Sequence, residues 1–94
     1  MKHTLLYLPQ VKDDLRHFAP TIKSLVKNAL EEISKNPRSG TPLVRELEGL
    51  WKYRTKRYRI LYEIHSKKRQ VLVYLIDQRK TVYDRIQQYW KGKE

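Results

Sequence analysis

The chain has 94 residues, with 21 lysines and arginines, 10 aspartates and glutamates, and no cysteine. This length predicts a single domain over residues 1–94 and excludes a second one. The lack of cysteine excludes a disulfide scaffold, a thiolate metal site and a cysteine nucleophile. No apolar run is long enough for a signal peptide or a membrane span, so we expect a soluble cytoplasmic protein that does not engage a membrane.

The formal net charge of +11 is unevenly distributed along the chain. Residues 1–50 carry 8 cations and 6 anions, whereas residues 51–94 carry 13 cations and 4 anions, a net charge of +9. A concentrated positive field repels itself and favours binding to phosphates or to an acidic protein. Composition alone does not choose between these two partners.

The first half of the chain predicts a strand followed by two helices. We expect the strand over residues 3–8, a short helix over residues 10–18, and a longer helix that begins at Pro20. The longer helix ends at Asn36–Pro37, because proline cannot donate the next backbone hydrogen bond and disfavours a helical residue before it. Its apolar stripe follows helical spacing and comprises Ile22, Leu25, Val26, Ala29, Leu30 and Ile33.

The second half predicts three strands and a last helix. The strands cover residues 50–57, 58–65 and 70–77, which are rich in Tyr, Ile, Val and Leu. Residues 55–57 turn the first of these strands into the second, and residues 66–69 form the polar turn of an antiparallel hairpin. Residues 81–90 predict a C-terminal helix. The order β-α-α-β-β-β-α indicates an α+β fold, in which a helical hairpin covers one face of a mostly antiparallel sheet and leaves the other available.

Residues 51–59 hold five cations and three aromatic residues in nine positions. Side chains alternate along a strand, so Lys52 and Arg54 share a face, and Arg57 and Arg59 share a face of the next strand. If the strands pair, these four cations converge, and their repulsion favours an anion such as a phosphate between them. The alternative is a solvated basic surface that needs no ligand. The interleaved aromatic rings favour nucleic acid.

Further candidates follow the last predicted strand. Arg79 and Lys80 stand at the end of that strand, and Tyr83, four residues after Arg79, lies on the same side of the last helix. Two simpler roles stay open. Tyr83 can pack in the core with its hydroxyl near solvent, and Arg79 can form a surface ion pair with Asp77.

The sequence predicts no metal and no cofactor. The three histidines lack metal-ligand spacing, and the acidic pairs 13–14 and 31–32 are typical of solvated helix surfaces. The glycines are isolated, so no phosphate-binding glycine loop is present.

Three motifs, Leu47–Arg54, Tyr58–Tyr62 and Asp77–Tyr83, together resemble the RelE/ParE superfamily of bacterial toxins. The resemblance spans the whole chain, including the helical hairpin. It implies a RelE-like toxin of a type II toxin–antitoxin system. Members of the RelE branch are ribosome-dependent endoribonucleases that cut mRNA in the A site, whereas members of the ParE branch share the fold and poison DNA gyrase.

The resemblance also implies the catalytic residues. The RelE branch uses two basic residues of the first motif, the arginine of a Tyr-Arg motif, an arginine after the last strand and a nearby tyrosine. By motif position these fall here on Lys52, Arg54, Arg59, Arg79 and Tyr83. ParE-like proteins generally lack this full set of residues, so its presence here favours a nuclease. Two departures stand out: Arg54 replaces a common lysine and is poorly suited to act as a base, and the spacing from Arg79 to Tyr83 is shorter than in the best-known nuclease.

The implied reaction is a metal-independent attack of the RNA 2′-OH on the adjacent phosphate, which yields a 2′,3′-cyclic phosphate and a 5′-OH. In this interpretation Arg59 and Arg54 stabilise the charge of the phosphorane, and Arg79 contacts the leaving side. Tyr83 or Lys52 assists deprotonation of the 2′-OH, and the sequence does not choose between them.

The resemblance implies several partners: a cognate acidic antitoxin, the ribosome with its small-subunit rRNA, and mRNA. We expect a monomer when free and a hetero-oligomer with the antitoxin. The other cations predicted to bind RNA are Lys56, Arg57, Lys67, Lys68, Arg69 and Lys80, with Lys91 and Lys93 assigned to rRNA contacts or solubility. Two alternatives stay open: a ParE-like gyrase inhibitor, and a non-catalytic basic RNA-binding module.

Overall fold

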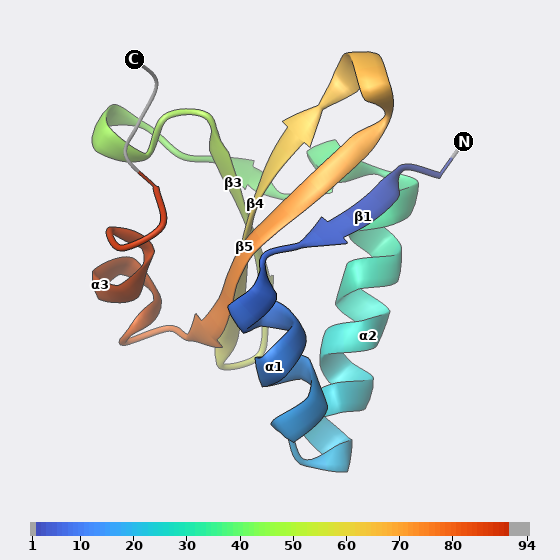
Figure 1. Ribbon diagram of the computed structural model, residues 1–94, viewed down its shortest axis with the longest axis vertical. Helices are drawn as coiled ribbons and strands as arrows, with labels where there is room; N and C mark the ends of the chain where they lie inside the picture. The colour runs from blue at the N-terminus through green and yellow to red at the C-terminus, as the bar shows by residue number, and fades with distance from the viewer. Residues whose placement is uncertain (1, 91–94) are drawn as a thin grey trace.

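A computed structural model describes residues 2–90, which form a five-stranded sheet with helices on both faces (Figure 1). The strands lie in the order β1-β5-β4-β3-β2. β1 runs parallel to β5, and every other neighbouring pair is antiparallel. The predicted α+β class is therefore confirmed. The strands are β1 (Thr4–Tyr7), β2 (Thr41–Pro42), β3 (Leu50–Thr55), β4 (Tyr58–His65) and β5 (Gln70–Gln78).

Two helices, α1 (Pro9–His17) and α2 (Pro20–Lys35), form the predicted hairpin between β1 and β2 (Figure 1). Each begins with proline in its first turn, where the missing N–H has no helical partner to lose. α2 ends before Pro37, as predicted. The predicted apolar stripe of α2 faces the sheet, and four of its six residues are buried: Val26, Ala29, Leu30 and Ile33.

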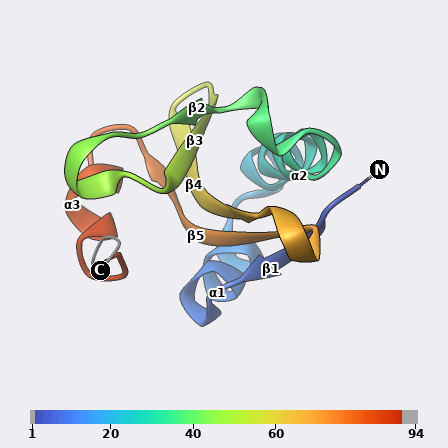
Figure 2. The ribbon, with the colours of Figure 1, turned by 90° about the horizontal axis from the view of Figure 1, so that it is seen from above.

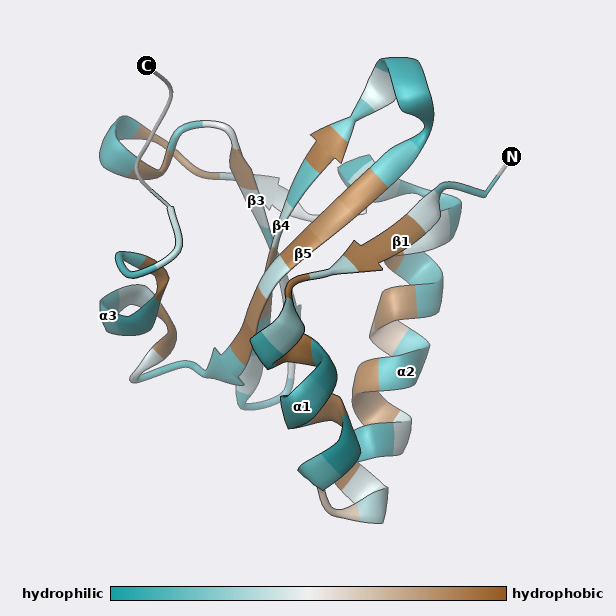
Figure 3. Ribbon diagram, in the orientation of Figure 1, coloured by the Kyte–Doolittle hydropathy of each residue, from teal (hydrophilic) through white to brown (hydrophobic). Residues whose placement is uncertain are grey.

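Two hydrophobic cores lie on opposite faces of the sheet, because side chains alternate along β4 and β5 (Figures 2 and 3). The first core lies under α1 and α2 and contains Val11, Val26, Ala29, Leu30, Ile33, Ile60, Tyr62, Val71, Val73 and Ile76. The second core lies under α3 (Val82–Ile86) and contains Leu50, Leu61, Leu75, Val82, Ile86 and Trp90. The expectation that one face of the sheet is left available is wrong, because this second core covers much of it.

Several boundaries differ from the sequence predictions. β3 ends at Thr55 instead of residue 57, because Lys56 has a φ of 49° and closes a tight turn. α3 covers five residues instead of ten, because after Ile86 the backbone tightens into turns. β2 was not predicted and has two residues. Three short 3-10 helices also occur, at Pro37–Ser39, Arg45–Leu47 and Ser66–Lys68. No helix within residues 2–90 is long and apolar enough to cross a membrane.

Candidate functional site

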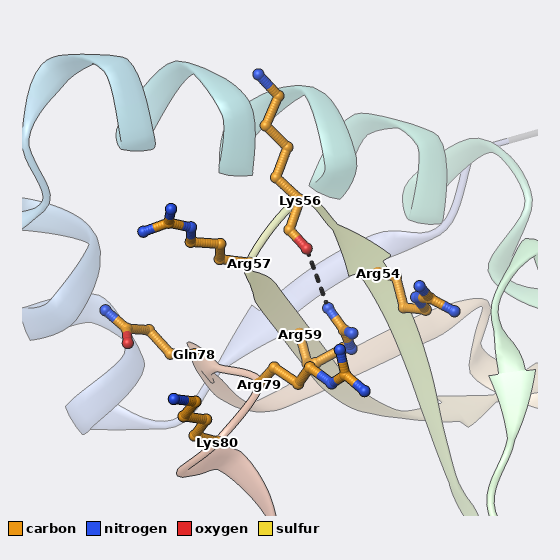
Figure 4. Close-up of a pocket in the computed structure, with 7 residues that line it drawn as sticks. All are labelled: Arg54, Lys56, Arg57, Arg59, Gln78, Arg79 and Lys80. Carbon is orange, nitrogen blue, oxygen red and sulfur yellow. Dashed lines mark hydrogen bonds between the residues drawn. The ribbon is translucent and has the colours of Figure 1, made fainter.

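The β3–β4 turn and the end of β5 enclose a cavity of about 510 Å³ (Figure 4). Its lining consists of six cations and one amide. They are Arg54, Lys56, Arg57, Arg59, Gln78, Arg79 and Lys80. The structure therefore brings together residues that are up to 26 positions apart in the sequence, from Arg54 to Lys80 (80 − 54 = 26).

Strand pairing explains how the cavity forms. Arg54 stands directly opposite Arg59 in the β3–β4 register, so both side chains leave the same face of the sheet. The backbone N–H of Arg79 donates to the carbonyl of Arg57 at 2.8 Å, which joins the segment after β5 to the β3–β4 turn. Arg57 itself lies in that turn, so the prediction that it shares a strand face with Arg59 is wrong. It still lines the cavity, from the turn instead of from β4.

Arg59 is the buried cation of the cavity and is only 5% exposed. Its Nη1 donates to the backbone carbonyls of Tyr58 at 3.0 Å and Lys56 at 3.3 Å. Within the described residues 2–90, no carboxylate lies at ion-pair distance from this guanidinium. A desolvated cation held by two carbonyls and lacking a carboxylate partner is well suited to bind an anion.

The electrostatics of the cavity agree with this geometry. Burial lowers the pKa of the Arg59 guanidinium, the charges of Arg54 and Arg79 lower it further, and Tyr83 raises it. Figure 4 shows the guanidinium groups of Arg54, Arg59 and Arg79 gathered together, whereas Lys56 extends away from them. A bound anion relieves the repulsion among the three guanidinium groups.

The two other residues predicted to be catalytic lie beside the cavity instead of in its lining. Lys52 shares the strand face of Arg54, is half-buried and lines an adjacent hollow that also includes Arg54. Tyr83 packs against the second core and still lies near enough to Arg59 to change its pKa. Tyr83 therefore packs against the core and also lies near the site.

Asp77 forms an ion pair with Arg85, not with Arg79. Its Oδ2 lies 2.9 Å from Nη1 of Arg85, and its Oδ1 accepts the backbone N–H of Gln78 at 2.7 Å. The expectation that Arg79 forms a surface ion pair with Asp77 is not met, and Arg79 remains in the cavity lining.

Three of the predicted RNA-binding cations lie elsewhere. Lys67, Lys68 and Arg69 follow β4 at the tip of the β4–β5 hairpin, at the opposite end of these strands from the cavity (Figure 1). Lys91 and Lys93 fall outside the described residues. Gln78 was missed by the sequence interpretation, although its place directly before Arg79, at the end of β5, is a usable signal. Within residues 2–90, no three His, Asp or Glu side chains are grouped as metal ligands are.

Comparisons with known proteins agree on one class. A family model described as the ParE toxin of the type II toxin–antitoxin system, parDE, matches residues 5–83. The chain is 33% identical over 87 residues to Toxin RelG of Mycobacterium tuberculosis, which covers 90% of this chain and all of that protein.

Solved structures show the same fold. The RelBE2 toxin–antitoxin complex from Mycobacterium tuberculosis matches with a TM-score of 0.76 and 31% identity, over 84% of this chain and 93% of the other. A mutant of E. coli toxin RelE in the free state matches with a TM-score of 0.73 and 18% identity, over 94% and 93% of the two chains. The protein is thus a toxin of a type II toxin–antitoxin system. It belongs to the RelE/ParE family.

Proposed function

We propose that this toxin is a ribosome-dependent endoribonuclease, an mRNA interferase that acts in the cytoplasm and cleaves mRNA in the ribosomal A site. The observation that carries the proposal is the buried Arg59 guanidinium, with Arg54 and Arg79 beside it and no carboxylate partner within residues 2–90. Preorganised cations of this kind stabilise the charge that develops on a phosphate in the transition state. The similarity to Toxin RelG supports the RelE branch.

The proposed reaction needs no metal. The 2′ oxygen of the RNA forms a bond to phosphorus, the bond from phosphorus to the 5′ oxygen breaks, and a 2′,3′-cyclic phosphate results. The proton of the 2′-OH passes to a base on the protein, and the leaving 5′ oxygen takes up a proton to become a hydroxyl. Arg59 and Arg54 stabilise the phosphorane, and Arg79 contacts the leaving oxygen.

Tyr83 is better placed than Lys52 to receive the proton. It is electrostatically coupled to Arg59, whereas Lys52 lines the adjacent hollow. We therefore assign Tyr83 as the general base and Lys52 as a contact to the neighbouring RNA backbone.

The other cations serve binding. Lys56, Arg57 and Lys80 line the cavity and are exposed, so they contact RNA phosphates on either side of the cleaved bond. Lys67, Lys68 and Arg69 contact small-subunit rRNA. The matched RelBE2 structure from Mycobacterium tuberculosis is a toxin–antitoxin complex, as are the matched structures of intact E. coli RelBE and of RelE-RelB from Pyrococcus horikoshii. By the same logic this toxin is a monomer when free and forms a hetero-oligomer with an acidic antitoxin.

The test is cleavage of mRNA on purified ribosomes, with new 5′ ends mapped on translated and untranslated transcripts. The wild-type protein should cut only the translated transcript. Arg59→Ala and Arg79→Ala should each lower the rate about 100-fold, the loss typical of a removed transition-state donor. Lys35→Ala, which removes an exposed cation at the end of α2 that does not line the cavity and has no proposed RNA contact, is the matched control and should retain most of the rate.

Other outcomes assign the protein differently. Intact mRNA together with inhibition of DNA supercoiling indicates a gyrase poison. Binding of RNA without cleavage indicates a non-catalytic module. If Arg59→Ala and Arg79→Ala fold normally and still arrest growth as the wild type does, the nuclease assignment is wrong.

A further inference from the structure

One carboxylate lies on the face of the sheet that carries the cavity. Asp77 stands opposite Arg59 in the β4–β5 register, just as Arg54 stands opposite Arg59 in the β3–β4 register. Directly paired residues of antiparallel strands leave the same face of the sheet. Asp77 is thus a natural ion-pair partner for the buried Arg59, and such a pair would compete with an RNA phosphate.

The structure shows Asp77 engaged elsewhere. Arg85 of α3 donates to its Oδ2 at 2.9 Å, and the backbone N–H of Gln78 donates to its Oδ1 at 2.7 Å. The second nitrogen of Arg85, Nη2, lies 3.9 Å from a carboxylate oxygen of Asp14 on α1. Both oxygens of Asp77 therefore have donors, namely the side chain of Arg85, which lies outside the cavity lining, and the backbone N–H of Gln78.

The ion pair between Asp77 and Arg85 is partly shielded from water, which strengthens the attraction between the two charges. The Asp77 side chain is 18% exposed and that of Arg85 is 36% exposed, so solvent screens their attraction less than it screens a surface pair. The hydrogen bond from Arg85 to Asp77 also raises the pKa of Arg85. Arg85 does not line the cavity itself.

We propose that Arg85 is a positioning residue, which neutralises Asp77 and holds its carboxylate away from Arg59 so that the cavity stays free to bind an RNA phosphate. This inference rests on the proposed function of the cavity as an RNA site. The same ion pair also joins α3 to β5, so a test must separate control of charge from simple attachment of the helix.

Arg85→Met makes this separation possible, because methionine keeps an unbranched apolar stem and removes the cation. The probe is a fluorescent 2′-O-methyl oligoribonucleotide, which has no 2′-OH and resists cleavage. Its dissociation constant is measured by fluorescence anisotropy at one fixed salt concentration, and the melting temperature of each variant is recorded. We expect Arg85→Met to weaken binding about tenfold, a change that corresponds to about 1.4 kcal/mol.

Two further variants at the same site identify the cause. Asp77→Asn alone should bind the RNA at least as tightly as the wild type, because it removes the competing charge. The double variant Asp77→Asn/Arg85→Met should return to within about twofold of the wild type. If the pair serves only to attach α3, the double variant will bind as weakly as Arg85→Met, and the inference is overturned.

Net charge is controlled with a second ion pair. Lys2 and Glu31 form an exposed pair at 2.6 Å that does not line the cavity. Lys2→Met and Glu31→Gln/Lys2→Met repeat the same charge changes and should alter binding less than about twofold. If Lys2→Met weakens binding as much as Arg85→Met does, the inference is also overturned.

The remaining outcomes are distinct. Asp14→Asn/Arg85→Met should stay as weak as Arg85→Met, because Asp14 lies on α1 and outside the cavity lining. Wild-type protein and Arg85→Met that bind the RNA equally overturn this inference and leave the proposed function standing. Wild-type protein that binds no RNA also overturns this inference, whereas the proposed function is decided separately by cleavage of mRNA on ribosomes.

Discussion

Replacing Tyr62 with phenylalanine removes one buried hydroxyl, with its hydrogen bonds, and one titratable group from the first core. The side chain is fully buried, and its hydroxyl donates to the carbonyl of Pro37 at 2.5 Å, which ties β4 to the 3-10 helix that follows α2. Phenylalanine keeps the ring and leaves this carbonyl without its donor. A buried unsatisfied acceptor costs about 1–3 kcal/mol. In a domain of this size, each kcal/mol lowers the melting temperature by roughly 4–8 °C.

The same substitution changes how stability depends on pH. Burial raises the pKa of Tyr62 to about 12, and a hydrogen bond with the backbone of Gly40 offsets part of the rise. In the unfolded chain a tyrosine ionises near pH 10. Between pH 10 and about 12, unfolding therefore releases a proton. The contribution of Tyr62 is complete below pH 10 and disappears as the pH rises to about 12.

The assay is urea unfolding followed by circular dichroism, at pH 7 and at several values from 9 to 11.5. In the wild type the free energy of unfolding should fall above pH 10, with a contribution from Tyr62 of up to about 1.4 kcal/mol per pH unit. The variant should start lower at pH 7 and fall less steeply. Tyr74, whose pKa burial and Glu63 also raise to about 12, is present in both proteins and cancels. Equal free energies at pH 7 and parallel curves above pH 10 would refute the reasoning.

Three more substitutions test other parts of the structure. Gly40→Ala places a methyl group against the carbonyl of Lys52 and the hydroxyl of Tyr62 at less than contact distance, so urea unfolding should show a loss of about 1–3 kcal/mol. Ile86→Ala leaves a cavity under α3, where Ile86 is fully buried, and should cost about 2–5 kcal/mol by the same measurement. Lys67→Ala removes an exposed cation and, if that lysine contacts a phosphate of single-stranded RNA, should reduce the salt dependence of RNA binding by about 0.7 in the log–log slope.

Each of these results has a clear opposite. A Gly40→Ala variant as stable as the wild type would mean that β3 moves aside freely. Wild-type stability in Ile86→Ala would mean that α3 contributes little to the second core. An unchanged salt slope in Lys67→Ala would remove this lysine from the RNA contacts.

Most of the fold was predictable because its apolar residues follow simple periods. Helical spacing from Ile22 to Ile33 indicated α2, and Pro20 and Pro37 marked its two ends. β4 was predicted with its observed bounds, Tyr58–His65. α3 was predicted too long, because spacing alone does not show that Trp90 leaves the helix to pack edge-on against Tyr74, with ring centroids 5.3 Å apart. β2 has only two residues, so it shows no hydrophobic periodicity from which it could be predicted.

The lining of the cavity was predicted in part, because side chains alternate along strands in a regular way. Alternation along two adjacent strands was enough to place Arg54 and Arg59 together. The turn at residues 55–57 was also predicted, whereas the positive φ of Lys56 was not, since the right-handed twist of the two strands favours it and lysine itself does not. The pairing of Asp77 with Arg85 depends on α3 folding back over the sheet, and the sequence interpretation considered only Arg79 as an alternative partner.

The parallel pairing of β1 with β5 sets an order of events during synthesis. Thr4 pairs with Gln70, 66 residues later in the chain (70 − 4 = 66). At ~5–20 residues per second, β1 waits several seconds before its partner leaves the ribosome. Arg79 and Lys80 emerge later still, and they complete the lining of the cavity. We therefore expect the nascent chain to lack a complete cavity until β5 and the two residues after it have left the ribosome.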